Sequence, residues 1–242
     1  MSFPPPFQTA RLSFVPMNAD QHADAVFEIR GRDDVMKYSI NHAPDPSVET
    51  THAWLSRFNH FDDRSRPDIS TSINADISPI GYVIHERLSS TDTNLPPSSE
   101  KQGEGKIIGT TGLRLGVSPL TPQSQSVQEK RWEIGYGFHP STWGRGIASE
   151  AVRGFIRVVG EEGLLGFPIG PTSSNDGTDP ETGSDSVNAS EEAKVKVKPV
   201  LAACTDALNE ASRRVLEKAG FVLTGEFVDG EGRGNFEFEY RF

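Results

Sequence analysis

The segment Trp132–Val159 constrains the fold more than any other part of the chain, because it joins an alternating stretch to an amphipathic one through glycines. Apolar residues alternate with charged or small ones from Trp132 to Phe138, and this period of two predicts a β-strand. Pro140 then ends the strand ladder. Apolar residues next recur at helical spacing, at Ala148, Ala151, Val152, Phe155 and Val159. The segment therefore predicts a strand, a turn and a helix.

The turn of this segment is suited to binding a phosphate. Gly144 and Gly146 lie where the helix should begin. A helix start exposes unpaired N–H groups and the positive end of the helix dipole, and glycines let a ligand approach the backbone. On the strand, Glu133 shares its face only with Gly135 and Gly137, which leaves room for a ligand. The same pattern is also typical of a strand, turn and helix whose small residues serve only packing.

Length and charge exclude several classes of protein. The chain has 242 residues, enough for one large domain or two small ones. It has 34 acidic and 24 basic residues and a net charge of −10, without a basic face that is visible in the sequence. This disfavours a nucleic-acid binder and a protein that docks on anionic membranes. An anionic ligand remains compatible, because helix-terminus amides bind phosphate without net basic charge.

Cysteine and histidine usage indicates the compartment and the metal content. Cys204 is the only cysteine, so no intrachain disulfide can form, and a cytoplasmic protein is expected. Met1–Phe7 lacks the features of a secretory signal, and no apolar run is long enough to span a membrane. The six histidines are scattered without metal-ligand spacing, so no metal is expected.

Further elements follow from the same periodicities. Strands are predicted at Arg11–Pro16, Ile80–Leu88, Lys106–Leu115, Pro199–Cys204, Phe221–Phe227 and Asn235–Phe242. Helices are predicted at Asn18–Arg30, Ser47–Phe61 and Asn209–Ala219. The inward stripe of the last helix is predicted to contain Ala211, Val215, Leu216 and Ala219.

Three polar stretches, near residues 89–105, 118–128 and 168–198, are interpreted as loop insertions in a single domain of residues 1–242. The longest contains Thr172–Glu192, which has six acidic residues and no Lys or Arg, and it is expected to be disordered. It is interpreted as an insertion and not as a linker, because the apolar pattern resumes directly after it.

The stretch Trp143–Ala151 resembles the coenzyme-binding signature of the GNAT N-acetyltransferase superfamily. Its form is most similar to the RimJ/RimL-like branch, the bacterial ribosomal-protein N-terminal acetyltransferases. Three other stretches resemble the same branch in the same order, namely Thr9–Leu12, Glu133–Phe138 and Asn209–Phe221. Together they cover nearly the whole chain apart from the polar insertions.

The resemblance implies an α/β fold of the mixed α+β type. It consists of a single mixed, mostly antiparallel twisted sheet of about seven strands flanked by about four helices. Its central strands should splay apart, with the pantetheine arm of acetyl-CoA in the gap and the pyrophosphate on the backbone of Gly144–Ala148. The residues expected to bind the coenzyme are Tyr136, Gly137, Phe138, Trp143, Gly144, Arg145, Gly146, Ile147, Ala148 and Asn209.

The resemblance also implies acetyl transfer to a primary amine by direct attack in a ternary complex. Glu133 is the expected general base, and the alternative is a structural carboxylate paired with an arginine. Many members have a tyrosine acid where this chain has Leu216, so Ser212 is the expected proton donor, with water as the alternative. Asn209 should also cap its helix, since Asn is a favoured N-cap. His139 is expected to be a backbone-paired turn residue.

Two other functions remain as alternatives. One is a non-catalytic module that binds acyl-CoA, because the tyrosine acid is absent. The other is a dinucleotide enzyme, although the full three-glycine fingerprint is missing and the preceding strands form hairpins. The expected partners are acetyl-CoA and an amine whose identity the sequence leaves open, without nucleic acid or membrane. A monomer or a homodimer is expected.

Overall fold

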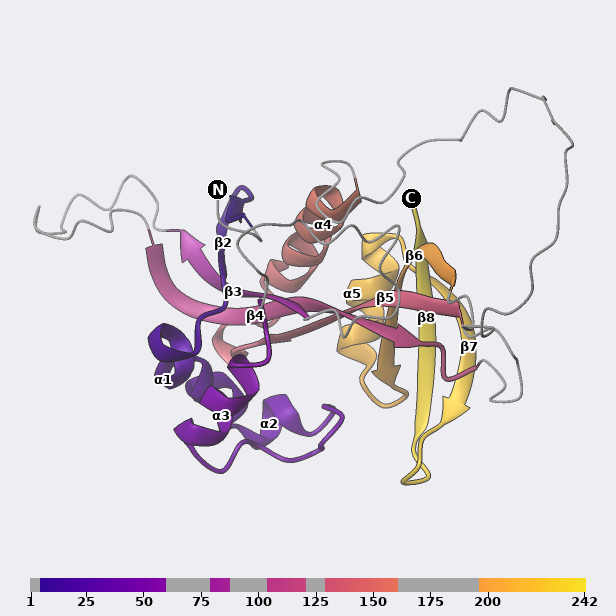
Figure 1. The fold of residues 1–242 in the computed structure, drawn as a ribbon, viewed down its shortest axis with the longest axis horizontal. Coiled ribbons are helices and arrows are strands. Elements are labelled where there is room, and N and C mark those ends of the chain that lie inside the picture. Colours follow the sequence, from indigo (N-terminus) through magenta and orange to yellow (C-terminus); the bar gives the residue numbers. More distant parts are fainter. Residues whose placement is uncertain (1–4, 60–78, 88–103, 121–128, 161–195) are drawn as a thin grey trace, which may run out of the picture.

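The computed structural model describes residues 5–59, 79–87, 104–120, 129–160 and 196–242, and Figure 1 shows their arrangement. Within these ranges, eight strands form one sheet in the order β1-β2-β3-β4-β5-β6-β8-β7. The strands are β1 (Phe7–Gln8), β2 (Leu12–Pro16), β3 (Ile80–Arg87), β4 (Glu104–Val117), β5 (Glu129–Phe138), β6 (Lys196–Asp206), β7 (Val222–Val228) and β8 (Gly234–Arg241). The helices are α1 (Ala19–Arg30), α2 (Asp33–Met36), α3 (Val48–Leu55), α4 (Ile147–Gly160), α5 (Glu210–Ala219) and the 3-10 turn η1 (Pro140–Thr142).

The sheet is mixed and mostly antiparallel, as expected. Strands β1 to β5 pair antiparallel in chain order, and β6, β8 and β7 also pair antiparallel. Only β5 and β6 run parallel. Strand β1 and helix α2 were not predicted, because two and four residues are too few for a period to show.

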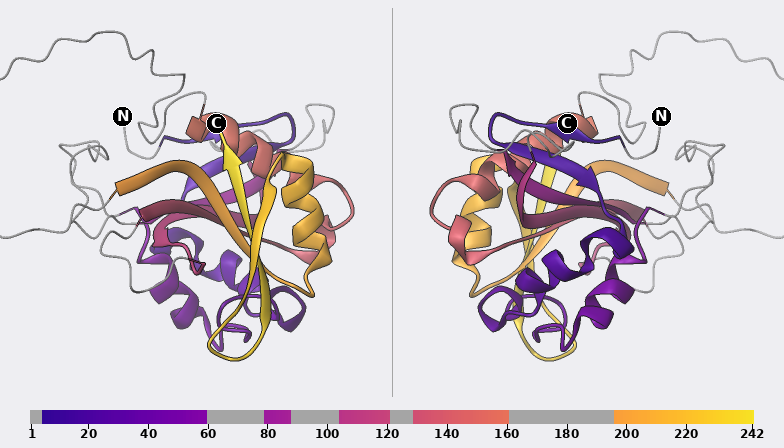
Figure 2. Two further views of the ribbon diagram at one scale, coloured as in Figure 1. Left: turned by 90° about the vertical axis from the view of Figure 1, so that its right-hand side faces the viewer. Right: turned by 90° about the vertical axis from the view of Figure 1, so that its left-hand side faces the viewer.

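Two apolar cores hold helices on opposite faces of the sheet. In the larger core, Trp132 and Phe138 of β5 lie in the same cluster as Phe155 of α4 and Leu216 of α5. In the smaller core, Val26 of α1 and Leu55 of α3 are clustered with Val83 of β3. The turned views in Figure 2 likewise separate α1–α3, drawn in indigo and purple, from α4 and α5. The sheet is therefore covered by α4 and α5 on one face and by α1 and α3 on the other.

The helix predicted at Ser47–Phe61 is shorter than expected. Ser47 is the N-cap of α3, and the helix ends at Leu55. Asn59 adopts a left-handed conformation with φ 61°, and its side chain bonds to the backbone N–H and C=O of Gly81. The chain thus leaves the helix to be fastened to β3, while Phe61 lies outside the described residues.

Two other expectations are wrong in detail. Ala211 is exposed and not inward, because only Leu216 and Ala219 of α5 are buried. Strand β6 begins at Lys196, where its backbone pairs with Glu129, so residues 196–198 of the predicted insertion belong to a strand. Residues 89–103, 121–128 and 168–195 of the predicted insertions lie outside the described residues. Within the described ranges, no helix is both long and apolar enough to cross a membrane.

Candidate active site

Strands β5 and β6 separate in the middle of the sheet. Their parallel ladder ends at the pair Glu133 and Ala202. Beyond it, Ile134–Phe138 pair with β4, while Ala203–Asp206 pair with β8. Figure 1 shows β4 and β5 running across the view, while β8 and β7 run nearly at right angles to them. We call the region between Ile134–Phe138 and Ala203–Asp206 the strand split, and it matches the expected divergence of the central strands.

A loop with two left-handed glycines joins β5 to α4. Gly144 and Gly146 have φ values of +73° and +75°, a region that other residues adopt only with strain. The first helical hydrogen bond runs from Glu150 N to Gly146 O at 3.1 Å. Helix geometry therefore leaves the N–H groups of Ile147, Ala148 and Ser149 without an intrahelical acceptor. The helix start has the geometry of an anion site.

The glycine face of β5 is open. A Cβ atom added at Gly135 would meet nothing within 4 Å, and one at Gly137 would meet only Thr110 Oγ1 at 3.9 Å. This face is shared with Val83, since Val83 pairs with Thr110 and Thr110 with Gly137. The face that carries Glu133 is therefore the α1–α3 side of the sheet. It offers the room expected from its residues.

Glu133 forms an ion pair with Arg114 in this structure. Its Oε1 accepts a hydrogen bond from Arg114 Nη2 at 2.7 Å, and the two residues are direct partners on β5 and β4. The Glu133 side chain is 13% exposed and that of Arg114 is 53% exposed. The pair expected for a structural carboxylate is thus present, but its arginine is on the surface, where such pairs contribute little.

Ser212 makes its contact on the other face of β5. Its Oγ lies 2.8 Å from the Tyr136 hydroxyl, which also donates to Ser212 O at 3.3 Å. Asn209 is the N-cap of α5, and its Oδ1 accepts from Ser212 N at 3.0 Å. Burial raises the pKa of Tyr136 to about 12, so its hydroxyl stays protonated at neutral pH. The hydroxyl pair joins β5, on one side of the strand split, to α5, the helix that follows β6.

Other residues expected to bind coenzyme support the loop. Trp143 is 52% exposed, and its indole N–H donates to Phe138 O at 3.1 Å. The guanidinium of Arg145 bonds to the carboxylate of Glu86 on β3. His139 Nδ1 accepts from Ser141 N at 3.2 Å and caps η1, as expected for a turn residue.

The hydrogen bonds that connect the turn between β1 and β2 to the start of α4 were not predicted from the sequence. Glu150 of α4 accepts hydrogen bonds from Thr9 and Arg11, which lie in the turn between β1 and β2. These bonds and the adjacent Arg11 guanidinium outweigh the effect of burial and lower the pKa of Glu150. Thr9–Leu12 was singled out as a motif, but a separation of 139 residues between Arg11 and Glu150 hides the contact.

Cys204 belongs to Ala203–Asp206, the part of β6 that forms one side of the strand split. Burial, reinforced by the charge of Glu133, raises the pKa of this thiol to about 12, so it is a thiol and not a reactive thiolate at neutral pH. In the part of the chain that the structure describes, no group of three His, Cys, Asp or Glu side chains could hold a metal ion.

Comparison with solved structures yields the same fold at low sequence identity. An acetyltransferase of the GNAT family from Bacillus anthracis is 16% identical, with 98% of each chain covered and a TM-score of 0.56. The microcin C7 self-immunity acetyltransferase MccE, in complex with acetyl-CoA and AMP, is 11% identical over 97% of this chain and 94% of its own, with a TM-score of 0.53. RimL, a ribosomal L7/L12 α-N-protein acetyltransferase in complex with coenzyme A, is 12% identical over 97% and 96%, with a TM-score of 0.52.

No curated protein matches the sequence. The model of the acetyltransferase (GNAT) domain family matches residues 11–222, which is most of the chain and includes both sides of the strand split. Together with the strand split and the glycine loop at the start of α4, this match means that the chain belongs to the GNAT family of acetyltransferases.

Proposed function

We propose that this acetyltransferase is an N-acetyltransferase, which transfers the acetyl group of acetyl-CoA to a primary amine by direct attack in a ternary complex. The observation that supports this most strongly is the strand split beside the glycine loop of α4. The loop offers N–H groups without intrahelical acceptors to phosphates, and the split offers an elongated ligand two strands that no longer pair with each other. Bound acetyl-CoA supplies the acetyl group as an activated thioester.

The chain's residues would serve the two ends of the reaction from opposite faces of the sheet. Glu133, on the α1–α3 face, accepts a proton from the amine, directly or through water, as the C–N bond forms. Amines of protein N-termini have a pKa of roughly 7.7–8.0, so a weak base suffices. Ser212, on the α4–α5 face, donates a hydrogen bond from its hydroxyl group to the sulfur as the C–S bond breaks. Backbone groups of Tyr136–Phe138 would stabilise the charge on the acetyl oxygen.

Glu133 Oε1 can receive a proton only when Arg114 releases it, because the Arg114 guanidinium occupies that oxygen with a hydrogen bond. The exposure of Arg114 permits this release at small cost. This pairing also favours the second candidate, a module that binds acetyl-CoA without turnover.

The cytoplasmic location, the RimJ/RimL-like branch and the state as monomer or homodimer stay predictions.

The test is the release of free thiol from acetyl-CoA with a panel of amines. The panel contains peptides with free N-termini, a polyamine, amino acids and an aminoglycoside. With the best amine, Glu133→Gln should lower kcat by about 100-fold or more, the usual size of a lost general base. Glu226→Gln, which changes an exposed carboxylate of β7, is the matched control and should leave kcat unchanged. Binding of acetyl-CoA without turnover of any amine would favour the second candidate. An unaffected Glu133→Gln enzyme would refute the assignment of the base.

A further inference from the structure

The turn between β1 and β2 is fastened directly to the first turn of α4. Glu150 Oε1 accepts from Thr9 Oγ1 at 2.6 Å and from Arg11 N at 2.8 Å. Glu150 Oε2 accepts from Arg11 Nε at 2.6 Å. Arg11 Nη1 also donates to Arg145 O at 3.1 Å. One arginine therefore holds both the beginning of the helix and the peptide that lies between the two left-handed glycines.

The contact has an electrostatic consequence for an anion at the loop. Glu150 lies in the first turn of α4, close to the N–H groups that a phosphate would approach. An unpaired carboxylate there would repel the phosphate and reduce the positive potential that the helix start offers it. The guanidinium of Arg11 cancels this charge. Its Nη2 also lies 3.7 Å from the position that a Cβ at Gly146 would occupy, so the cation lies beside the loop itself.

The contact also has a conformational consequence. A loop with glycines at positions 144 and 146 has many accessible backbone conformations when it is free. The bond from Arg11 to Arg145 O selects the conformation in which both φ values are positive. A loop that is held in its binding conformation binds its ligand more tightly, because less entropy is lost.

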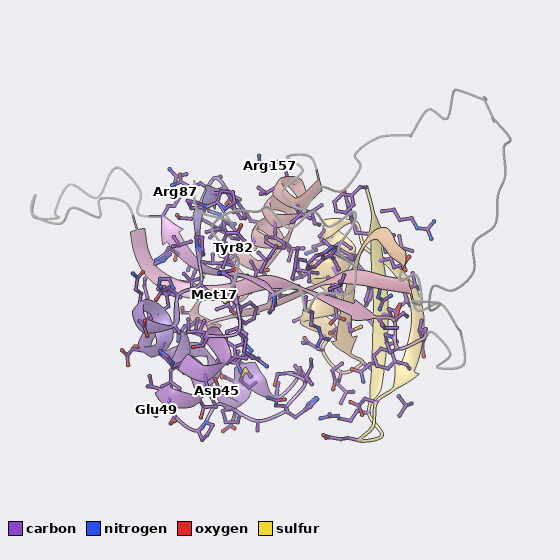
Figure 3. All side chains as sticks on the ribbon, in the orientation of Figure 1. Met17, Asp45, Glu49, Tyr82, Arg87 and Arg157 are labelled. Carbon is purple, nitrogen blue, oxygen red and sulfur yellow. The ribbon has the colours of Figure 1, made fainter. Side chains whose placement is uncertain are left out.

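The turn that carries Arg11 is itself held in place. Arg87 of β3 donates from its backbone to Arg11 O at 2.8 Å and from Nη1 to Thr9 O at 2.9 Å. Thr9 also packs so closely on α4 that a Cβ at Gly154 would lie 2.4 Å from Thr9 Cγ2. Figure 3 shows Arg87 and Arg157 on the side of the molecule where β2 and α4 lie. The backbone of Arg11 is thus fixed, and its half-exposed side chain is held by hydrogen bonds to Glu150 Oε2 and Arg145 O.

We propose that Arg11 is a positioning residue of the coenzyme's phosphate site, which it builds by fixing the Arg145 peptide and neutralising Glu150. The inference rests on the proposed function, because it assumes that the loop receives the phosphates of CoA. It assigns a role at this site to the first strand pair, which lies far from it in the sequence.

The test compares the dissociation constants of CoA and of pantetheine, which has the same arm without phosphates, by titration calorimetry. Arg11→Ala should weaken CoA binding roughly tenfold, because a charge-assisted contact is lost and a repulsive carboxylate is left, and should change pantetheine binding little. Arg157→Ala is the control, because it removes the same charge from the far end of α4, where Arg157 donates to Gln8 O at 3.5 Å. It should change neither constant by more than about twofold.

A second variant separates the two roles. Adding Glu150→Gln to Arg11→Ala removes the uncompensated charge and should recover part of the affinity for CoA. Absence of recovery would refute the electrostatic role.

Equal weakening of CoA and pantetheine, or no weakening of either, would overturn the whole proposal. Should Arg11→Ala fail to fold, Arg11→Lys tests the positioning role alone, since it keeps the charge that offsets Glu150 and loses the planar fork; it should still weaken CoA binding more than pantetheine binding. A parent protein that binds no CoA contradicts the proposed function, whereas a parent that binds CoA and an unaffected Arg11→Ala contradict this inference alone.

Discussion

At the residue scale, a pair of hydroxyl groups joins Tyr136 of β5 to Ser212 of α5. Leu216, the position at which the resemblance to the GNAT superfamily implies a tyrosine acid, is buried and has no proton to donate. Tyr136 reaches Ser212 from the strand instead, at 2.8 Å. The phenol has one proton, which can go to Ser212 O or to Ser212 Oγ; when it goes to Oγ, the serine proton is free to point at a leaving sulfur. Tyr136 would then act through Ser212 and orient its hydroxyl.

Tyr136→Phe tests this role, because it removes the hydroxyl and keeps the ring. We expect kcat to fall roughly fivefold, the effect of one net hydrogen bond, while KM for acetyl-CoA stays within about twofold. Steady-state kinetics of Tyr136→Phe, Ser212→Ala and the double variant measure the coupling. Because the two hydroxyls act as a unit, the double variant should be no slower than Ser212→Ala alone. Multiplicative losses would show that the two act independently.

At the element scale, β5 carries different functions along its length. Its end at the strand split is open and meets the glycine loop, whereas its beginning is fixed by a buried ion pair. Arg131 bonds to Glu237 of β8 and is 3% exposed. Ser118, just after β4, donates to both oxygens of Glu237 at 2.9 Å, so β4 is also tied to β8. This cluster holds the two halves of the sheet together where they are still paired, which allows them to separate beyond Glu133.

Glu237→Gln should destabilise the protein by about 3 kcal/mol, because it leaves a buried arginine without its closest counter-charge. The measurement is the free energy of unfolding in urea. Glu226→Gln on β7 provides the control, and at that exposed position it should change stability by less than about 0.5 kcal/mol. If both variants were equally stable, the ion pair would not hold the sheet together.

At the scale of the whole molecule, buried acidic groups predict a loss of stability in alkali. Burial raises the pKa of Cys204 from 9.0 to about 12 and that of Tyr136 from 10.0 to about 12. Both groups are therefore protonated in the folded state at pH values where the unfolded chain has lost the proton. Their contribution to stability is complete below pH 9 and is lost as the pH rises toward 12, by up to about 1.4 kcal/mol per pH unit for each group.

The free energy of unfolding in urea, measured at several pH values between 8 and 11, reports this loss. The ordinary pKa of a thiol such as Cys204 is 9.0. Cys204→Ala should flatten the decline that begins near pH 9. Tyr136→Phe should leave that first part unchanged and flatten the part above pH 10, the ordinary value for its hydroxyl. A parent whose stability is constant up to pH 11 would contradict the burial of these groups.

Much of this architecture could be predicted from the sequence. Period-two and helical patterns located β2 to β8, α1, α4 and α5 within a few residues, since each pattern reflects one buried face. The glycine loop and the Asn209 cap were also predicted, because both depend on local backbone geometry. An arginine partner for Glu133 was expected, but its identity as Arg114 was not predicted, and neither were the pairs Tyr136–Ser212 and Arg11–Glu150, because each joins segments whose register only the folded sheet determines. The early end of α3 has the same cause, since Asn59 bonds to a strand distant in sequence.

Thermal unfolding with and without acetyl-CoA tests the coenzyme site most directly, in the parent and in Gly146→Glu. The variant places a side chain at φ +75° and a negative charge at the phosphate loop. Gly230→Glu is the control, because it adds the same charge at an open position in the turn between β7 and β8. At a hundredfold the dissociation constant, acetyl-CoA should stabilise the parent and the control by roughly 2.7 kcal/mol and leave the melting temperature of Gly146→Glu unchanged. A parent whose melting temperature stays the same at millimolar acetyl-CoA, or a Gly146→Glu variant stabilised as much as the parent, would contradict the assignment of this loop as the coenzyme site.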